Sequence, residues 1–447
     1  MADSPTATAA PFRFMDLPAE LRDEVYTYLL DPEDHCKYDE DGVKTKYTYD
    51  LRFYRTCKQV YAEAKRVFRV LACNTFARIE TPWEEAQQHV MVEGMVPVVA
   101  SGRAAENFHH IHVRIIIDAP FHELEDEDTK KFIVFVDDME RFTKMWMYSD
   151  LSYSGDLNPH LRLRLILQNP SVPAGDDYIK MSKALQKKIL LPFGNVKNLR
   201  DVKVLSSESG VIIDKSVEEE MRRIISAPYD TAEVCLDKTK KLMDEGDRLT
   251  EGVDGDVNGN GATSPNYLGA VEKYIEAFAA MHIVCIKRRR SIWGDAWFDR
   301  VLQSGYYKGK HGQIVRLTLR VELVSAVTNA YYQVGMTSKA PDDLKYLSEA
   351  HFWGDRTIGL IREHVSPNDI PHDNFPREAR RAMGKLYLKT GMAGMELAKH
   401  VPLQLDDRRS STDQRMKPDA KRMLMAARRW CPDDEEVEKG LWRYGLS

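Results

Sequence analysis

Apolar residues near the start of the chain recur at helical spacing. Leu21, Val25 and Leu29 lie four residues apart, which places their side chains on one face of a helix. Pro18 suits the first turn of that helix, where a backbone N–H has no partner within the helix, and Pro32 ends it. The pattern therefore predicts one short helix with a single apolar stripe.

A second short helix is predicted a little further along the chain. Thr56 and Gln59 have the T-x-x-Q spacing of a capping box, which marks a helix start. The expected buried stripe of this helix consists of Val60, Ala64, Val67 and Leu71. Both helices are too short to be stable alone in water, so they must pack on each other or on a partner.

Strand and helix patterns alternate in the middle of the chain. Period-2 alternation of apolar residues predicts strands at 110–118, 161–167 and 199–205. Helical spacing of apolar residues predicts helices at 132–146, 181–191 and 216–226. This β-α-β-α-β order favours a small, mostly parallel sheet that is covered by helices.

Gly, Asp and Asn dominate residues 246–266, which are expected to form a flexible linker. Asp254, Asp256 and Asn258 match the first ligand positions of a calcium-binding loop. Pro265 stands where that loop needs a bidentate glutamate, so calcium binding is not expected. The expected fold class is α+β, with a helical module at 12–76, an α/β region at 77–245 and an all-helical region at 267–447.

Two segments of the C-terminal region are similar to each other. Tyr331 and Tyr387 each begin a Tyr-x-x-x-Gly-Met sequence. Gly384, Tyr387 and Gly391 have a spacing that resembles the first helix and turn of a tetratricopeptide repeat, with Gly391 in the turn. The second helix of that repeat and its terminal proline are matched by Ala420, Leu424, Ala427 and Pro432. The resemblance implies a concave partner-binding surface, and an ordinary helical bundle fits the same pattern.

The charge of the chain is close to balance. Its 64 basic and 69 acidic residues give a net charge of −5, which provides no basic footprint for nucleic acid or an anionic membrane surface. No apolar run is long enough to span a bilayer, and residues 1–11 lack the features of a secretory signal. The six cysteines are scattered without a pattern, as is typical of reduced thiols in the cytoplasm or nucleus.

Motifs of catalysis and phosphate binding are missing from the sequence, including G-x-G-x-x-G, G-x-S-x-G and H-E-x-x-H. His110 and His112 could share one strand face as metal ligands, but no nearby cysteine or acidic pair completes the shell, which favours a core or sheet-edge role. The basic cluster Lys287–Arg290, followed by Ser291, fits a nuclear import signal, a kinase site at Ser291 or a helix end. We therefore expect no catalytic residue, no cofactor and no bound metal.

The N-terminal motifs together resemble the F-box, in the divergent form common in fungal proteins. They are Leu-Pro-x-Glu-Leu at 17–21, Arg-Thr-Cys-x-Gln-x-Tyr at 55–61 and Asn-Thr-Phe at 74–76. The chain departs from the family in its acidic insert, Glu33–Asp50, and in the absence of a terminal tryptophan. In the family this module binds the Skp adaptor of SCF-type ubiquitin ligases. The resemblance implies that the same contact is made here by Leu17, Pro18, Leu21, Val25 and Leu29.

The expected function is that of a substrate-recognition or adaptor subunit, which acts by bringing an unknown protein substrate close to the ligase rather than by bond chemistry. One alternative is a scaffold protein that takes no part in a ligase. Another is an enzyme with an unrecognised site at the strand ends of the α/β region. A third is purely structural: the helical module caps the next domain, in which case the five residues of the expected contact are buried.

Overall fold

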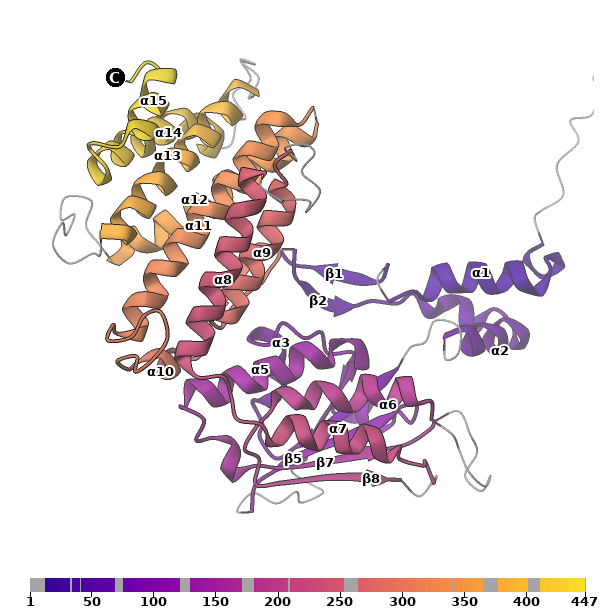
Figure 1. The fold of residues 1–447 in the computed structure, drawn as a ribbon. Helices are drawn as coiled ribbons and strands as arrows, with labels where there is room; N and C mark the ends of the chain where they lie inside the picture. Colours follow the sequence, from indigo (N-terminus) through magenta and orange to yellow (C-terminus); the bar gives the residue numbers. More distant parts are fainter. Residues whose placement is uncertain are drawn as a thin grey trace, which may run out of the picture. The chain divides into compact units, whose positions relative to one another are not determined.

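The chain folds into two compact units, Met1–Tyr229 and Asp230–Ser447 (Figure 1). The computed structural model describes residues 13–32, 34–40, 42–68, 75–120, 129–170, 181–207, 210–252, 264–339, 341–364, 377–400 and 411–446. The fold class is α+β, as predicted: the first unit contains a mixed sheet with helices, and the second is built mainly from long helices.

The division between the two units does not fall in the expected linker. Helix α8, Ala232–Glu251, packs against α9, Tyr267–Ala280, and both belong to the second unit. Residues 232–245, which the sequence pattern placed in the middle region, are therefore part of the C-terminal unit. Residues 253–263, with the calcium-loop positions, lie outside the described part of the chain.

The N-terminal module contains the two expected helices, α1, Ala19–Leu30, and α2, Lys58–Arg66. The insert between them forms an antiparallel hairpin of β1, Cys36–Tyr38, and β2, Lys44–Tyr47. Three residues of the predicted α2 stripe, Val60, Ala64 and Val67, are buried as expected, and Leu71 lies outside the described residues.

The predicted capping box of α2 is wrong by one residue. A 3₁₀ turn, Leu51–Arg55, runs directly into α2, so Thr56 has helical backbone angles and cannot serve as the extended cap. Its hydroxyl donates to the carbonyl of Phe53 at 2.7 Å instead. Cys57 is the N-cap, and its Sγ accepts from the backbone N–H of Val60 at 3.4 Å.

Six strands form one sheet in the order β4-β6-β3-β5-β7-β8. Only β3–β5 and β7–β8 are parallel, whereas β4–β6, β6–β3 and β5–β7 are antiparallel, so the expectation of a mostly parallel sheet is wrong. The strands span Phe76–Thr81 (β3), Ala100–Ser101 (β4), Val113–Asp118 (β5), Lys130–Phe135 (β6), Arg162–Leu167 (β7) and Asp201–Ser206 (β8).

Strand β6 explains this error. The sequence pattern assigned 132–146 to one helix, but Phe132–Phe135 are in β6, and α5, Met139–Ser152, begins after it. Phe132 and Val134 enter the main core, while Ile133 and Phe135 enter a second core on the other face. With both faces buried, the strand is a continuous apolar run that lacks the alternation of a half-exposed strand. The additional strand reverses the chain direction between β5 and β7.

Helices cover one face of the sheet (Figure 1). Residues of α5, of α6, Lys183–Leu190, and of α7, Lys215–Ser226, pack with the inward side chains of the strands in the main core. The remaining elements of this unit are two short helices, α3, Ala86–Val92, and α4, Arg103–Glu106. The predicted strands at 110–118, 161–167 and 199–205 and the predicted helices at 181–191 and 216–226 are confirmed within a few residues.

The second unit contains one hairpin among its helices, so the expectation of an all-helical region is wrong at that point. The hairpin consists of β9, Ile283–Ile286, and β10, Arg289–Ile292. The other elements are α10, Asp295–Phe298, α11, Gly312–Thr337, α12, Asp342–His364, α13, Arg377–His400, α14, Ser411–Trp430, and α15, Glu435–Arg443.

The basic cluster Lys287–Arg290 spans the turn of this hairpin instead of a helix end. The Arg288 guanidinium pairs with the Glu349 carboxylate on α12 at 2.7 Å. The Arg290 guanidinium lies 4.5 Å from the Trp353 ring centre and donates to Thr357 Oγ1 at 2.9 Å. Two arginines of the cluster therefore fix the hairpin to α12.

The repeat-like residues meet between α13 and α14. Tyr387 is 5% exposed and stacks on Trp430 with ring centres 6.4 Å apart, so its predicted packing against a neighbouring helix is confirmed. The prediction that Gly391 occupies a turn is wrong, because Gly391 lies inside α13. A Cβ atom at this glycine would lie only 3.0 Å from the carbonyl oxygen of Ala420. The glycine therefore allows α13 and α14 to approach closely.

Candidate functional site

Helix α1 has one buried face and one exposed face. Arg22, Tyr26 and Leu30 follow one another at i, i+4 and i+8 and are buried. The predicted stripe lies one residue earlier and points away from them, since neighbouring residues are separated by about 100° around a helix. In this stripe Leu21 is 47% exposed, Val25 37% and Leu29 42%. The sequence thus located the helix and its apolar stripe, and the structure shows this stripe on the outside.

Two further positions extend this outer surface. Pro18, at the start of α1, is exposed, and Leu17 before it is half-buried. Tyr28 is 69% exposed and was not singled out from the sequence, although its i+3 and i+7 spacing from Val25 and Leu21 could have revealed it. We call Pro18, Leu21, Val25, Tyr28 and Leu29 the outer face of α1.

The inner face of α1 is held by a buried cluster of polar bonds. Arg22 donates to both carboxylate oxygens of Glu63 on α2, at 2.9 and 2.7 Å, and also to the carbonyl of Leu17. The Tyr26 hydroxyl donates to Glu63 at 3.2 Å. The hydrogen bonds from Arg22 are the main cause that lowers the pKa of Glu63 to about 2. Burial, helped by the bond to this carboxylate, raises the pKa of Tyr26 to about 12.

Aromatic side chains complete the core of the module. The Tyr26 ring has Phe14 edge-on at 5.5 Å and Phe53 stacked at 6.2 Å between ring centres. Leu30 and Val67 are fully buried in the same cluster. The module therefore has a core that does not use the outer face of α1, and burial of the five expected contact residues as a cap on the sheet domain is not what the structure shows.

The strand ends were the expected place for an unrecognised enzyme site. Glu80, near the end of β3, is 3% exposed and accepts hydrogen bonds from Arg78 and Arg114, each at 2.8 Å. Asp118, at the end of β5, is also buried. Its carboxylate accepts hydrogen bonds from Arg162 at 2.6 Å and from Arg164 at 2.7 Å, both on β7. Two guanidinium groups occupy the oxygens of each carboxylate, so both carboxylates act as structural anions.

The paired histidines belong to the core. His110 and His112 are 5% and 7% exposed, with ring centres 5.3 Å apart. His112 Nδ1 accepts from the backbone N–H of Phe76 at 3.3 Å, and burial lowers the pKa of His112 to about 4. Within the described ranges no group of three His, Cys, Asp or Glu side chains is arranged to hold a metal ion.

Comparison with protein-family models, with curated proteins and with solved structures finds no match to this chain. Among the helices that the structure describes, none is both long and apolar enough to cross a lipid bilayer. The interpretation of the outer face of α1 as a binding surface therefore rests on its geometry and on the residues of the N-terminal motifs.

Proposed function

We propose that this chain is a substrate-recognition or adaptor subunit that docks on the Skp adaptor of an SCF-type ubiquitin ligase through the outer face of α1. The observation that supports this most directly is the exposure of Leu21, Val25, Tyr28 and Leu29 on a helix whose buried side, about 100° around the axis, is engaged in a core. An exposed apolar row of this kind on a folded helix is typical of a protein-binding surface.

The proposed mechanism is proximity. The N-terminal module holds the ligase, while the remaining surface of the chain holds a protein substrate near the activated ubiquitin, so that no side chain of this protein takes part in bond chemistry. Cytoplasm and nucleus are the compartments in which we expect such a ligase assembly to act. The helices of the second unit offer an extended surface for the substrate, as helical arrays do.

Co-precipitation of the full chain with purified Skp tests this function. The variant Leu21→Asp/Val25→Asp places two charges on the outer face, where both side chains are already exposed, so the fold should be kept. We expect a loss of Skp binding of roughly a hundredfold or more, as for removal of two interface anchors. Leu268→Asp on α9, where the side chain is 42% exposed, is the matched control and should bind Skp normally.

Two outcomes separate the alternatives. Normal Skp binding by the double variant, with an unchanged melting temperature, contradicts docking through α1. Absence of Skp binding by the unmodified chain contradicts the ligase function. The outer face is then the binding surface of a scaffold protein. Its partner would be identified by comparing the proteins that the unmodified chain and the double variant retain.

A further inference from the structure

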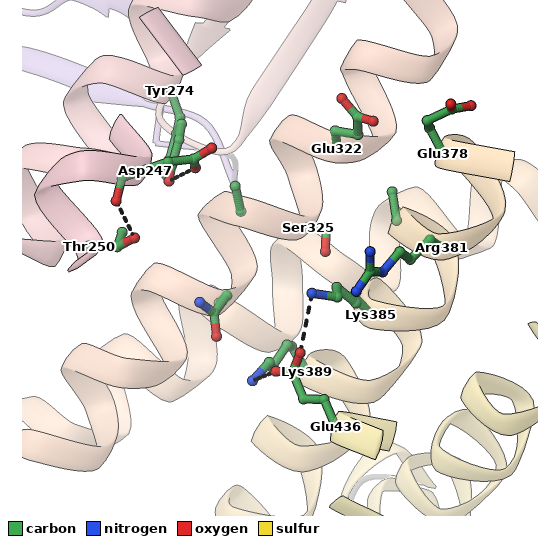
Figure 2. A pocket seen from close by; sticks show the side chains of 13 residues that line it. Asp247, Thr250, Tyr274, Glu322, Ser325, Glu378, Arg381, Lys385, Lys389 and Glu436 are labelled. Atoms are coloured by element: carbon green, nitrogen blue, oxygen red, sulfur yellow. Dashed lines mark hydrogen bonds and ion pairs between the residues drawn. The ribbon is translucent and has the colours of Figure 1, made fainter. Parts of the chain in front are cut away.

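A polar pocket of about 510 Å³ opens among the helices of the second unit (Figure 2). Side chains of α8, α9, α11, α13 and α15 line it. Its volume lies in the range of small-ligand sites, but its lining carries more charge than such sites usually do. The arrangement of these charges is therefore the feature that indicates what the pocket can bind.

One end of the pocket is acidic. Asp247 on α8, Glu322 on α11 and Glu378 on α13 contribute carboxylates there. Asp247 accepts a hydrogen bond from Tyr274 at 2.7 Å, but within the described residues no cation forms an ion pair with Glu322 or Glu378. Burial is the main cause that raises the pKa of Glu322; the nearby charge of Lys240 opposes this effect, and the charges of Glu378 and Asp247 add to it. This end therefore has an excess of negative charge that a bound cation would relieve.

The other end of the pocket is basic. Arg381, Lys385 and Lys389 lie four residues apart on one face of α13 (Figure 2). Lys389 and Lys385 share a single carboxylate, that of Glu436 on α15, at 2.7 and 3.3 Å. Arg381 lies one turn from Glu378, is 70% exposed, and is paired at 3.6 Å with Asp434, so the free positive charge of this end belongs to the two lysines. Two lysines with one carboxylate leave a positive charge that a bound anion would neutralise.

Helix α11 connects the two ends. Glu322 lies at the acidic end, and Ser325 and Asn329 follow along the pocket wall. With a rise of 1.5 Å per residue, the seven residues from Glu322 to Asn329 cover about 10 Å. Their hydroxyl and amide groups offer neutral hydrogen-bond partners between the charged ends. A ligand of this length that carried only an anion or only a cation would satisfy one end and meet like charge at the other.

We propose that this pocket binds a basic amino acid in dipolar form, with its carboxylate against Lys385 and Lys389 and its side-chain cation against Glu322 and Glu378. A carboxylate and a side-chain cation are presented together by free arginine or lysine, which adds an α-ammonium beside the carboxylate, and by an arginine or lysine at the C-terminus of a protein, which does not. In either case the ligand replaces water at both ends with charge-assisted hydrogen bonds. The site lies wholly in the second unit, so its occupation does not depend on Skp docking by α1.

Calorimetric titration of the full chain at low salt, without Skp, tests the ligand. The probes are L-arginine, L-lysine, the tripeptide Gly-Gly-Arg, its C-terminal amide, and agmatine, which keeps the guanidinium of arginine but lacks the carboxylate. We expect binding of the probes that have both charges, and affinities about 10- to 100-fold weaker for agmatine and for the amide, because Lys385 and the buried Lys389 then lose the ligand carboxylate.

The two sources of the ligand give different results in this experiment. Binding of L-arginine or L-lysine without binding of the tripeptide identifies a free amino acid, whereas binding of the tripeptide identifies a chain end. Binding of agmatine as tight as that of L-arginine overturns the proposal, because the carboxylate then has no role. Absence of binding by every probe overturns it as well.

Variants of the pocket provide the second arm. Glu322→Gln and Lys385→Gln each remove one of the charges that faces the ligand and should weaken L-arginine binding by about tenfold or more. Glu322→Gln is expected to fold, since burial already disfavours the charged form of this side chain. Glu140→Gln and Lys144→Gln on α5, an exposed pair 3.1 Å apart, are the matched controls. Equal affinities in the pocket variants and the controls contradict the site.

Discussion

Arg22 on α1 and Glu63 on α2 form a bidentate ion pair, with N–O distances of 2.9 and 2.7 Å, beneath the outer face of α1. The same guanidinium donates to the carbonyl of Leu17, so it also holds the turn that leads into the helix. Since these bonds fix the rotation of α1 about its own axis, they determine that Leu21, Val25 and Leu29 point outward rather than into the core.

The Arg22–Glu63 pair predicts a pH dependence of the N-terminal module. In the folded chain the pKa of Glu63 is lowered to about 2, whereas the unfolded value is about 4.3. A lowered folded pKa stabilises the module above the unfolded pKa, and this contribution is lost as the pH falls from about 4.3 towards 2. The protection factors of the α1 amides, which are exchange rates corrected for the intrinsic effect of pH, should therefore fall over this range. Glu63→Gln should show a flatter pH profile, and identical profiles in both proteins would contradict the prediction.

Truncation of Tyr387 tests the packing between α13 and α14. Tyr387 is 5% exposed and stacks on Trp430, so Tyr387→Ala should leave a cavity and lower the free energy of unfolding by about 2–5 kcal/mol. Chemical denaturation monitored by circular dichroism measures this change. Tyr306→Ala is the control, because Tyr306 is 74% exposed and its loss should change the stability little. Equal stabilities of the two variants would show that the stacked pair is not part of the core.

Glycines in two neighbouring helices should respond to alanine in opposite directions. At Gly391 a Cβ atom would lie 2.8 Å from Leu424 and 3.0 Å from the Ala420 carbonyl oxygen, so Gly391→Ala should destabilise by about 1–3 kcal/mol. At Gly359 on α12 nothing lies within 4 Å of that atom, and Gly359→Ala should stabilise by up to about 1 kcal/mol through helix propensity. Thermal denaturation gives both signs, and stabilisation by Gly391→Ala would refute close contact of α13 with α14.

The hairpin arginines are expected to be structural. Arg290 is largely buried over Trp353, and burial lowers its pKa to about 10. Arg290→Ala should destabilise the second unit by about 1–3 kcal/mol, because the packing on Trp353 and the hydrogen bond to Thr357 Oγ1 are both lost. Lys287→Asn removes an exposed charge at the turn, where the backbone φ is 52° and asparagine is tolerated, and should leave the melting temperature unchanged. A similar effect of both substitutions would argue against anchoring on α12.

Apolar spacing predicted the positions of most helices, because the helical period of about 3.6 residues is visible in the local sequence. Which face of a helix is buried depends on the elements that pack against it. On α1 the inward side includes Arg22, a polar residue whose burial requires a partner 41 positions away in the sequence, Glu63. The apolar stripe beside it looked equally suitable for a core. In β6 the opposite problem arose, since Phe132–Phe135 are buried on both faces and show no alternation.

The charged pocket could not be predicted from the sequence, for a related reason. Asp247, Glu322, Lys389 and Glu436 are distributed over four helices that lie far apart in the sequence: α8, α11, α13 and α15. The spacing of Arg381, Lys385 and Lys389 on α13 was visible in the sequence, but whether such a row faces water or a pocket depends on contacts made far along the chain.

The acidic insert gives the N-terminal module a mechanical role. Tyr47 of β2 donates to the Asp138 carboxylate at 3.0 Å, and its ring meets Phe135 of β6 edge-on at 4.5 Å. These contacts are made by residues that lie between α1 and α2 in the sequence. The insert is therefore a rigid connection to the sheet and not a flexible loop. A force that a bound partner exerts on α1 is therefore transmitted to the sheet through folded strands. The distance between the partner and the sheet is set by the stiffness of these strands and not by the length of a flexible linker.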